Sequence, residues 1–111
     1  MSSGDRRLYE LKASVLRALA HPLRLAIVDF LSEGEQCVCD IAEHVEGERS
    51  NVSRHLAVML RAGVLECRKD GLRVLYSLRA PCVLDFLSCA TAVLRADLES
   101  RRAVFSSFHE G

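Results

Sequence analysis

Two cysteines separated by one residue, Cys37 and Cys39, are the residues of this chain whose type and spacing best suit chemistry. They stand directly before Asp40 and residues 41–45, which have the pattern of a short helix. The start of a helix favours negative charge, so a thiolate placed there is stabilised. The pair therefore suits the binding of one soft, thiol-seeking atom.

The cysteines of this chain do not have the pattern of a disulfide framework. The chain has five, an odd number without the dense spacing of a small secreted fold: Cys37, Cys39, Cys67, Cys82 and Cys89. Reduced thiols in a reducing compartment are the better interpretation. The sequence contains no Ser/His/Asp set, no paired catalytic carboxylates, no phosphate-binding Gly-rich loop and no Cys-x-x-Cys pair. We therefore do not expect an enzyme.

Length and composition predict a single domain over residues 1–111. Half of the residues are apolar, but no uninterrupted apolar run approaches the roughly 18 needed to span a bilayer. Residues 1–5 also lack the apolar core of a signal peptide. We expect a cytoplasmic protein with no membrane contact.

The formal net charge of zero conceals an uneven distribution of charge. Residues 49–79 carry 7 basic and 2 acidic side chains, whereas residues 1–48 carry 5 basic and 9 acidic ones and residues 80–111 carry 3 and 4. The middle of the chain is thus strongly cationic. A local basic surface of this kind is typical of nucleic-acid binding, even in a chain that is neutral as a whole.

Helical periodicity and helix-boundary residues predict two helices ahead of the cysteines. Apolar residues recur at helical spacing over residues 6–19. Pro22 is well placed to open a second helix that continues to Leu31, and Gly34 would cap its end.

Two short helices around a tight turn follow. The first begins with Cys37 near its N-cap and ends by Val45, and the second covers about residues 49–62, with Gly63 as its stop. A turn over residues 46–48 joins them, which is the pattern of a helix-turn-helix.

A β-hairpin and a long helix complete the expected fold. Residues 64–78 alternate around Asp70-Gly71 and predict a hairpin, the wing, whose inner face would carry Val74, Tyr76 and Leu78. The last helix, about residues 81–103, has an apolar stripe too long for one small core, and we expect fraying from Val104 onward. We therefore predict a mainly α, winged helix-turn-helix fold, dimeric through its first and last helices.

Polar and basic residues cluster on the second helix of the helix-turn-helix and on the wing. The beginning of such a helix reaches base edges in the major groove, which predicts contacts with double-stranded DNA. The candidates on the helix are Arg49, Ser50, Asn51, Ser53, Arg54 and His55. The candidates on the wing, which would contact phosphates or the minor groove, are Arg68, Lys69 and Arg73.

The order of these elements, together with residues 19–25, 37–41 and 52–56, resembles the ArsR/SmtB family of bacterial metalloregulatory repressors. The likeness covers about residues 10–98. It implies a homodimer on a palindromic operator, released when a thiophilic metal or metalloid binds.

The resemblance also implies a role for the cysteine pair. Cys37 and Cys39 match the ligands of members that respond to As(III) or Sb(III), and less closely those that respond to Cd(II) or Pb(II). The arsenite pattern often has a third cysteine where this chain has Ala42. The cadmium and lead pattern adds cysteines from the N-terminal arm, whereas residues 1–36 of this chain contain none. The third ligand could be solvent, Cys82 or Cys89.

The family's zinc site on the last helix is not expected here. Residues 81–105 contain no histidine, and Asp85 with the distant pair His109-Glu110 is an insufficient ligand set. For Cys82 and Cys89 we favour plain packing at a dimer interface.

Two other functions fit part of the pattern. The same fold could sense oxidants or persulfides through its thiols. A metal-carrying or thiol-exchange protein, whose winged helix contacts other proteins, would not bind operator DNA, and the cationic middle segment argues against it.

Overall fold

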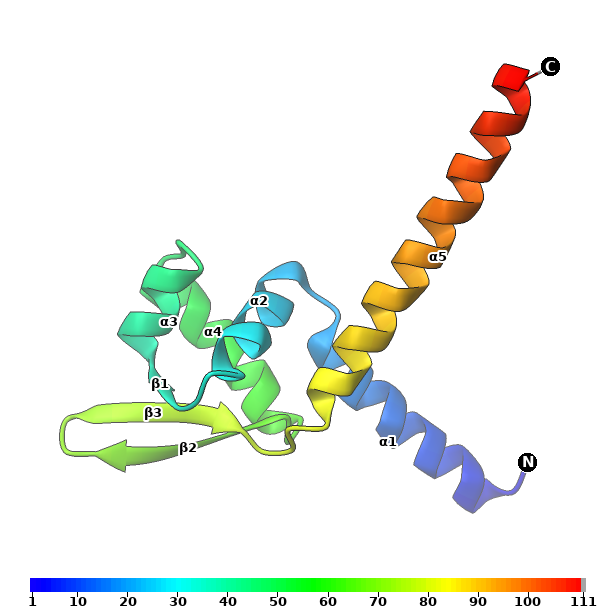
Figure 1. Ribbon diagram of the computed structural model, residues 1–111. Helices are drawn as coiled ribbons and strands as arrows, with labels where there is room; N and C mark the ends of the chain where they lie inside the picture. Colours follow the sequence, from blue (N-terminus) through cyan, green and yellow to red (C-terminus); the bar gives the residue numbers. More distant parts are fainter. Residues whose placement is uncertain (111) are drawn as a thin grey trace. The chain divides into compact units, whose positions relative to one another are not determined.

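The computed structural model describes residues 1–110, and the side chains of residues 1–107. The chain forms two compact units, residues 1–81 and the part from residue 82 onward. Figure 1 shows the helices and the three-stranded sheet of the first unit and the single long helix of the second. No helix within residues 1–110 is both long and apolar enough to cross a membrane.

Side-chain caps define the first two helices. Helix α1, Ser3–Leu19, begins earlier than residue 6 because Ser2 and Asp5 form a reciprocal capping box. Helix α2, Pro22–Leu31, has Pro22 in its first turn, as expected. His21 is its N-cap, and its Nδ1 atom accepts a hydrogen bond from the Leu23 amide at 3.1 Å.

Helices α3, Val38–His44, and α4, Arg49–Arg61, form the helix-turn-helix. Their connection is tight: a Cβ atom on Gly47 would lie 3.0 Å from the Cγ2 atom of Val52, so a larger residue would require one of them to shift by a few tenths of an ångström. Gly63 ends α4 as expected, with φ of 80° and a Schellman pair of hydrogen bonds, from Gly63 to Leu60 and from Val64 to Met59.

Three antiparallel strands form a sheet in the order β1-β3-β2. Strands β2, Leu65–Asp70, and β3, Arg73–Leu78, are the expected wing hairpin. The turn is Gly71-Leu72, one residue later than expected; Gly71 has φ of 65°, which suits glycine at the first central position of a type II′ turn. The sequence did not predict β1, Gln36–Cys37, which pairs with β3.

The inner face of β3 differs from the prediction. Leu75 is buried, whereas Val74, Tyr76 and Leu78 are only partly covered. Residues 74–76 are all apolar, so alternation alone could not identify the inner face. Pairing with β1 makes β3 the central strand and places Leu75 opposite the buried Cys37.

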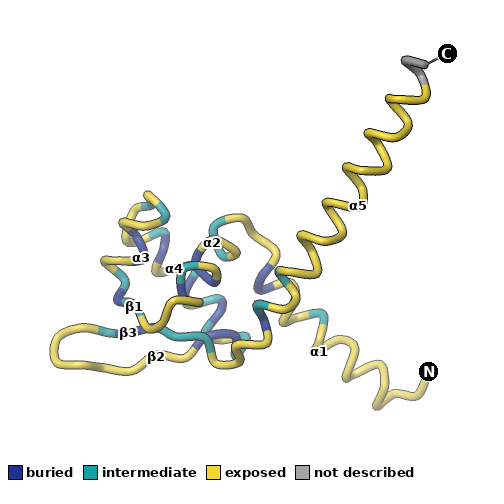
Figure 2. The backbone as a smooth tube through the Cα atoms, in the orientation of Figure 1, coloured by how far each residue is buried: buried dark blue, intermediate teal, exposed yellow. Residues whose placement is uncertain are grey.

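The core of the first unit lies between the helices and the sheet (Figure 2). Its fully buried side chains come from α2, α3, α4 and β2: Ile27, Val28, Ile41, Val52, Leu56, Met59 and Leu65. Leu60, which is also on α4, is only partly covered. The buried side of α4 fixes which of its residues can face outward.

The second unit is helix α5, Val83–Glu110. It continues past residue 103, where the sequence pattern had placed its end, because no glycine or proline interrupts it. Large apolar side chains along it are exposed: Phe86, Val93, Leu94, Leu98, Val104 and Phe105. His109 and Glu110 lie outside the residues whose side chains are described.

Candidate DNA-binding surface and thiol site

The outward face of α4 carries most of the candidate DNA-binding residues. Arg49, Ser50, Ser53 and Arg54 are exposed. Asn51 is partly covered, and its Oδ1 atom accepts a hydrogen bond from Nη2 of Arg54 at 3.1 Å. This pairing orients the Arg54 guanidinium along the helix surface. The first turns of α4 therefore present donors and positive charge to the outside.

His55 lies differently from the other candidates. It is half-buried, its Nδ1 atom accepts a hydrogen bond from Nε of Arg24 at 3.1 Å, and its ring centroid lies 4.4 Å from that of His21. Burial lowers the pKa of His55, and the nearby His21, Arg24 and Arg54 lower it further. The side chain thus joins α4 to α2 instead of extending outward.

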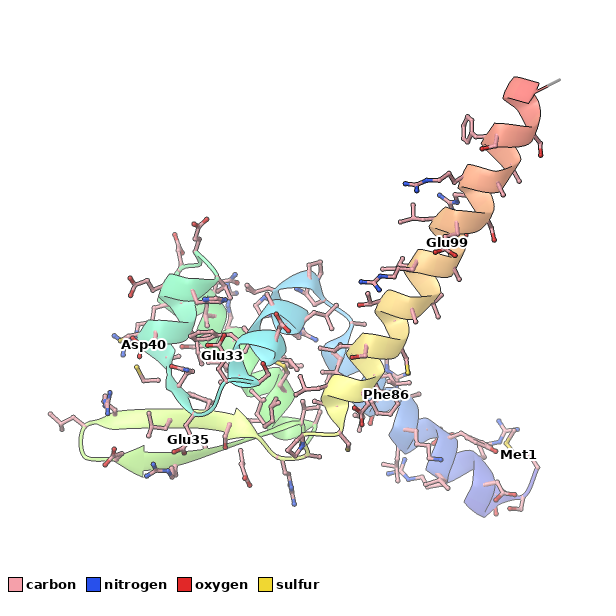
Figure 3. All side chains as sticks on the ribbon, in the orientation of Figure 1. Met1, Glu33, Glu35, Asp40, Phe86 and Glu99 are labelled. Atoms are coloured by element: carbon pink, nitrogen blue, oxygen red, sulfur yellow. The ribbon has the colours of Figure 1, made fainter. Side chains whose placement is uncertain are left out.

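The wing arginines are paired with carboxylates. Arg68 donates two hydrogen bonds of 2.7 Å, from Nε and Nη2, to the two carboxylate oxygens of Glu35. Glu35, labelled in Figure 3, precedes β1. These bonds lower the pKa of Glu35, so the pair stays ionised at neutral pH. Arg73 lies 3.9 Å from Asp70, and both are exposed. Lys69 is exposed beside them.

The two cysteines of the pair occupy different environments. Cys37 is buried, ends β1 and is the N-cap of α3, although its side chain makes no capping hydrogen bond. Cys39, in the first turn of α3, is exposed. The predicted position at the start of this helix is thus confirmed, with the addition that Cys37 is also fixed to the wing through its pairing with Leu75.

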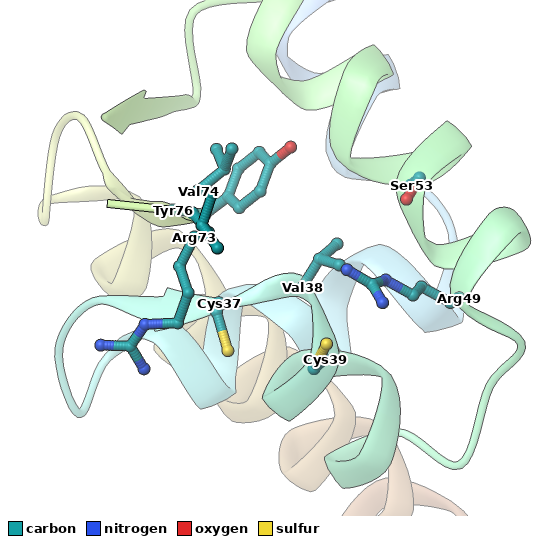
Figure 4. A pocket seen from close by; sticks show the side chains of 9 residues that line it. Cys37, Val38, Cys39, Arg49, Ser53, Arg73, Val74 and Tyr76 are labelled. Carbon is teal, nitrogen blue, oxygen red and sulfur yellow. The ribbon is translucent and has the colours of Figure 1, made fainter. Parts of the chain in front are cut away.

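Both thiols line a cavity of about 260 Å³ between α3, α4 and the wing. Figure 4 shows the Arg49 side chain extending from the start of α4 toward Val38 and Cys39. Ser53 also lines the cavity from α4, and the wing contributes Leu72, Arg73, Val74 and Tyr76. Burial raises the pKa of Tyr76, so its phenol is neutral at physiological pH.

The donor set at this cavity is two sulfur atoms. Within residues 1–107, no three Cys, His, Asp or Glu side chains come together in a way that could hold a metal ion. Two thiols suit a thiophilic ion such as trivalent arsenic, which needs one further ligand to complete a pyramidal site. Cys67 is exposed on β2, and Cys82 and Cys89, which belong to the second unit, are also exposed.

Two residues with clear roles at this surface were missed by sequence reasoning. Glu35 holds Arg68, and Arg24 holds His55. Glu35 stands next to β1, whose two residues are too few to give a strand pattern. Arg24 lies in a helix where an arginine is ordinarily a solvated side chain, so nothing in the sequence distinguished it.

The helix-turn-helix followed by a hairpin, with an exposed basic face on α4, defines a winged helix-turn-helix protein of the DNA-binding class. Residues 21–66 match the model of the bacterial regulatory protein, arsR family. An uncharacterised HTH-type transcriptional regulator of Mycobacterium tuberculosis, Rv0081, is 39% identical over 94% of this chain and 92% of its own length. The chain therefore belongs to the ArsR family of bacterial regulatory proteins, which are transcriptional regulators and not enzymes.

Solved structures support the same assignment. The crystal structure of Rv0081 matches with a TM-score of 0.75 and 40% identity, covering 85% of this chain and 95% of that one. A homodimeric winged helix-turn-helix domain from Mycobacterium bovis matches with a TM-score of 0.78 and 29% identity, covering 90% of this chain and 93% of that one. The predicted fold class is confirmed.

Several relatives are named for metals or metalloids. The arsenical resistance operon repressor of Staphylococcus xylosus is 34% identical over 72% of this chain and 76% of its own length. A cadmium resistance regulator homologue of Staphylococcus aureus is 42% identical, over 60% of this chain and 55% of its own length. Metal response is thus common among the relatives, and they do not share one metal.

The Glu35–Arg68 pair gives a first prediction. Replacing Glu35 with glutamine removes the negative charge that holds the Arg68 guanidinium through two hydrogen bonds. Arg68 should then be free to contact DNA phosphates. We expect tighter DNA binding and a salt dependence steeper by about one unit in the slope of log K against log salt. Fluorescence anisotropy on a labelled duplex at several salt concentrations would measure both.

Glu33 supplies the control for this prediction. It is exposed in the same connection between α2 and β1, so Glu33→Gln changes the net charge equally near the wing. Equal changes in affinity and salt slope for the two variants would show that the Arg68 contact is irrelevant.

Proposed function

We propose that this chain is a cytoplasmic, homodimeric repressor that occupies a palindromic operator and leaves it when trivalent arsenic or antimony binds Cys37 and Cys39. Cadmium or lead are the alternative inducers. The observation that carries the proposal is the position of both thiols in one cavity with residues of α4 and the wing. An ion bound there would sit next to both elements that approach DNA.

Thiol chemistry supports this choice of inducer. Trivalent arsenic and antimony form bonds with thiolate sulfur, and two thiolates provide two of the three bonds of a pyramidal site. Solvent supplies the third in this proposal, since Cys37 and Cys39 are the two cysteines that line the cavity. The Arg49 guanidinium, which also lines the cavity, adds positive charge beside the thiolates.

The link to DNA binding is mechanical in this proposal. Cys37 is held by β1 against β3, whereas Cys39 moves with the first turn of α3. A single ion bonded to both sulfur atoms fixes the start of α3 relative to the wing. Because α4 packs on α3, this changes the position of α4 relative to the wing. For the inducer to release DNA, it must bind more tightly to the form of the dimer that has the lower DNA affinity.

The DNA-contacting residues in this proposal are the exposed ones. Arg49, Ser50, Ser53 and Arg54 would enter the major groove with Asn51 orienting Arg54, and Lys69 and Arg73 would contact the phosphates or minor groove beside it. Arg68 joins them only when it leaves Glu35. His55 is removed from the set of direct contacts that the sequence suggested, because its acceptor is held by Arg24.

Dimerisation is supported by the exposed apolar residues of α1 and of α5, considered separately. On α1 these include Leu8, Leu11 and Leu16. A soluble protein rarely leaves two such helix faces uncovered. The Mycobacterium bovis relative of the same fold is homodimeric.

A DNA-release titration tests the proposal. The probe is a fluorescently labelled duplex that the wild-type protein selects from a random library, and arsenite, antimonite, cadmium and lead salts are added to the preformed complex. We expect arsenite and antimonite to lower the anisotropy to that of free DNA at micromolar concentration. Unchanged affinity with all four ions would refute induction by metal at this site.

A redox function is the second candidate, and exposed thiols favour it. All five cysteines are free, and Cys39, Cys67, Cys82 and Cys89 are exposed. Oxidants or persulfides could therefore reach them and form a disulfide or polysulfide. Mass spectrometry after peroxide or persulfide treatment, combined with the same DNA-release assay, distinguishes this candidate from the metal response.

A further inference from the structure

We propose that Arg24 and His55 form a latch that holds α4 in its DNA-binding orientation, and that protonation of His55 in mildly acidic solution opens this latch and weakens DNA binding. The latch makes Arg24 and His55 positioning residues. It also makes the regulator sensitive to pH through a site separate from the thiols.

Arg24 joins three helices. Its Nε atom donates to Nδ1 of His55 on α4 at 3.1 Å, and its Nη1 atom donates to the backbone carbonyl oxygens of Ala18 at 3.3 Å and Arg17 at 3.5 Å. These carbonyls belong to the last turn of α1, where a cation is favourable. The guanidinium is therefore fixed from α1 while it holds α4.

The hydrogen bond is possible in only one protonation state of His55. Nδ1 accepts from Arg24, so it carries no proton, and the neutral ring has its hydrogen on Nε2. A second proton would have to go on Nδ1. It would replace the acceptor with a donor and place an imidazolium cation against a guanidinium.

The surroundings of His55 oppose this proton. The titratable or charged groups that act on its ring, in the part of the chain that the structure describes, are His21 and Arg24 from α2 and Arg54 from α4 itself, and all three are basic. Burial and these neighbours lower the pKa of His55 below its ordinary value of 6.5.

The lowered pKa of His55 determines how the stability of the folded protein depends on pH. Folded His55 binds its proton less tightly than the unfolded chain does, so the folded state loses stability as pH falls through and below the ordinary histidine range. Above that range the ring is neutral in both states and the latch is fully formed. The loss therefore begins below neutral pH.

A direct contact between His55 and DNA would give the opposite sign. A protonated histidine at a phosphate strengthens binding on acidification, because it adds a positive charge. The latch predicts weaker binding at pH 5.5 than at pH 7.5, by less than about tenfold, because a pKa below 6.5 limits how much of His55 is protonated at pH 5.5. The direction of the change thus distinguishes the two roles.

Three variants test the latch on the library-selected duplex described above. His55→Asn keeps a hydrogen-bond acceptor near the position of Nδ1 but cannot titrate. It should bind DNA like the wild type at pH 7.5, and its latch should stay closed at pH 5.5, so the loss of affinity caused by latch opening should be absent. His55→Leu removes the acceptor and should bind weakly at both pH values. His44→Asn removes an exposed histidine of α3 outside the latch and should keep the wild-type pH profile.

Nuclear magnetic resonance on the wild-type protein provides a readout that does not depend on any variant. The imidazole nitrogen shifts of His55 should show the neutral ring with its hydrogen on Nε2, and its titration midpoint should lie below the ordinary histidine value of 6.5. Circular dichroism at pH 5.5 checks that the protein stays folded. Tighter binding of the wild type in acid, an equal loss of affinity for His55→Asn, or a His55 midpoint at or above 6.5 would overturn the proposal.

Discussion

Replacing both Cys37 and Cys39 with serine is expected to abolish release from DNA by arsenite or antimonite while leaving DNA binding intact. Hydroxyl groups do not replace thiolates as ligands of these soft ions. Each single variant should weaken the response by more than about 100-fold, because even indirect ligand support is worth 10- to 100-fold. The measurement is the anisotropy titration with each ion, with thiolate absorption counted per dimer.

The structure explains why these variants should still fold. Serine at position 37 keeps a small side chain at the N-cap of α3, where a hydroxyl can accept a hydrogen bond that the cysteine does not make. Position 39 is exposed, so its substitution disturbs no core packing. DNA affinity without inducer should change less than twofold in the single Cys39→Ser variant.

Cys67→Ser is the matched control for the thiol prediction. Cys67 is exposed on β2 and does not line the cavity that holds the cysteine pair. This variant should respond to arsenite like the wild type. A double Cys37, Cys39 variant that still leaves DNA on addition of arsenite would disprove the assignment of the site.

Introducing glutamate at Leu94 and Leu98 should convert the dimer to monomers and reduce DNA affinity by more than about 100-fold. The two side chains are one helical turn apart on α5 and are 63% and 62% exposed. If they meet a second copy, buried carboxylates will prevent association. A monomer binds one half-site only and loses an avidity that typically amounts to 10²–10⁴.

Sedimentation velocity measures the first effect and anisotropy the second. Ala92→Glu is the control, because residue 92 is also exposed and lies on the opposite side of α5 from Leu94 at 100° per residue. It adds one negative charge, as each of the two leucine substitutions does. It should remain a dimer. Dimers that persist in the Leu94, Leu98 variant would place the subunit interface elsewhere.

The sequence by itself determined the order and type of nearly all elements. Capping and breaking residues are local signals: His21-Pro22 begins α2, and Gly63 ends α4, because their backbone preferences act without distant partners. The position of Cys37 at the start of α3 follows from the same local rules. Membership of the ArsR family was also predictable, since three short segments and the order of elements carry the resemblance.

Only the tertiary structure decided which side chains are available at the surface. Strand β1 exists because β3 pairs with it, and this pairing selects Leu75 as the inner residue of an apolar run that has no alternation of its own. The sequence predicts that His55 is an outward polar residue, but in the structure it accepts a hydrogen bond from Arg24, thirty-one positions away. Long-range partners of this kind leave no periodic trace in a sequence, because one favourable contact constrains two positions and not the residues between them.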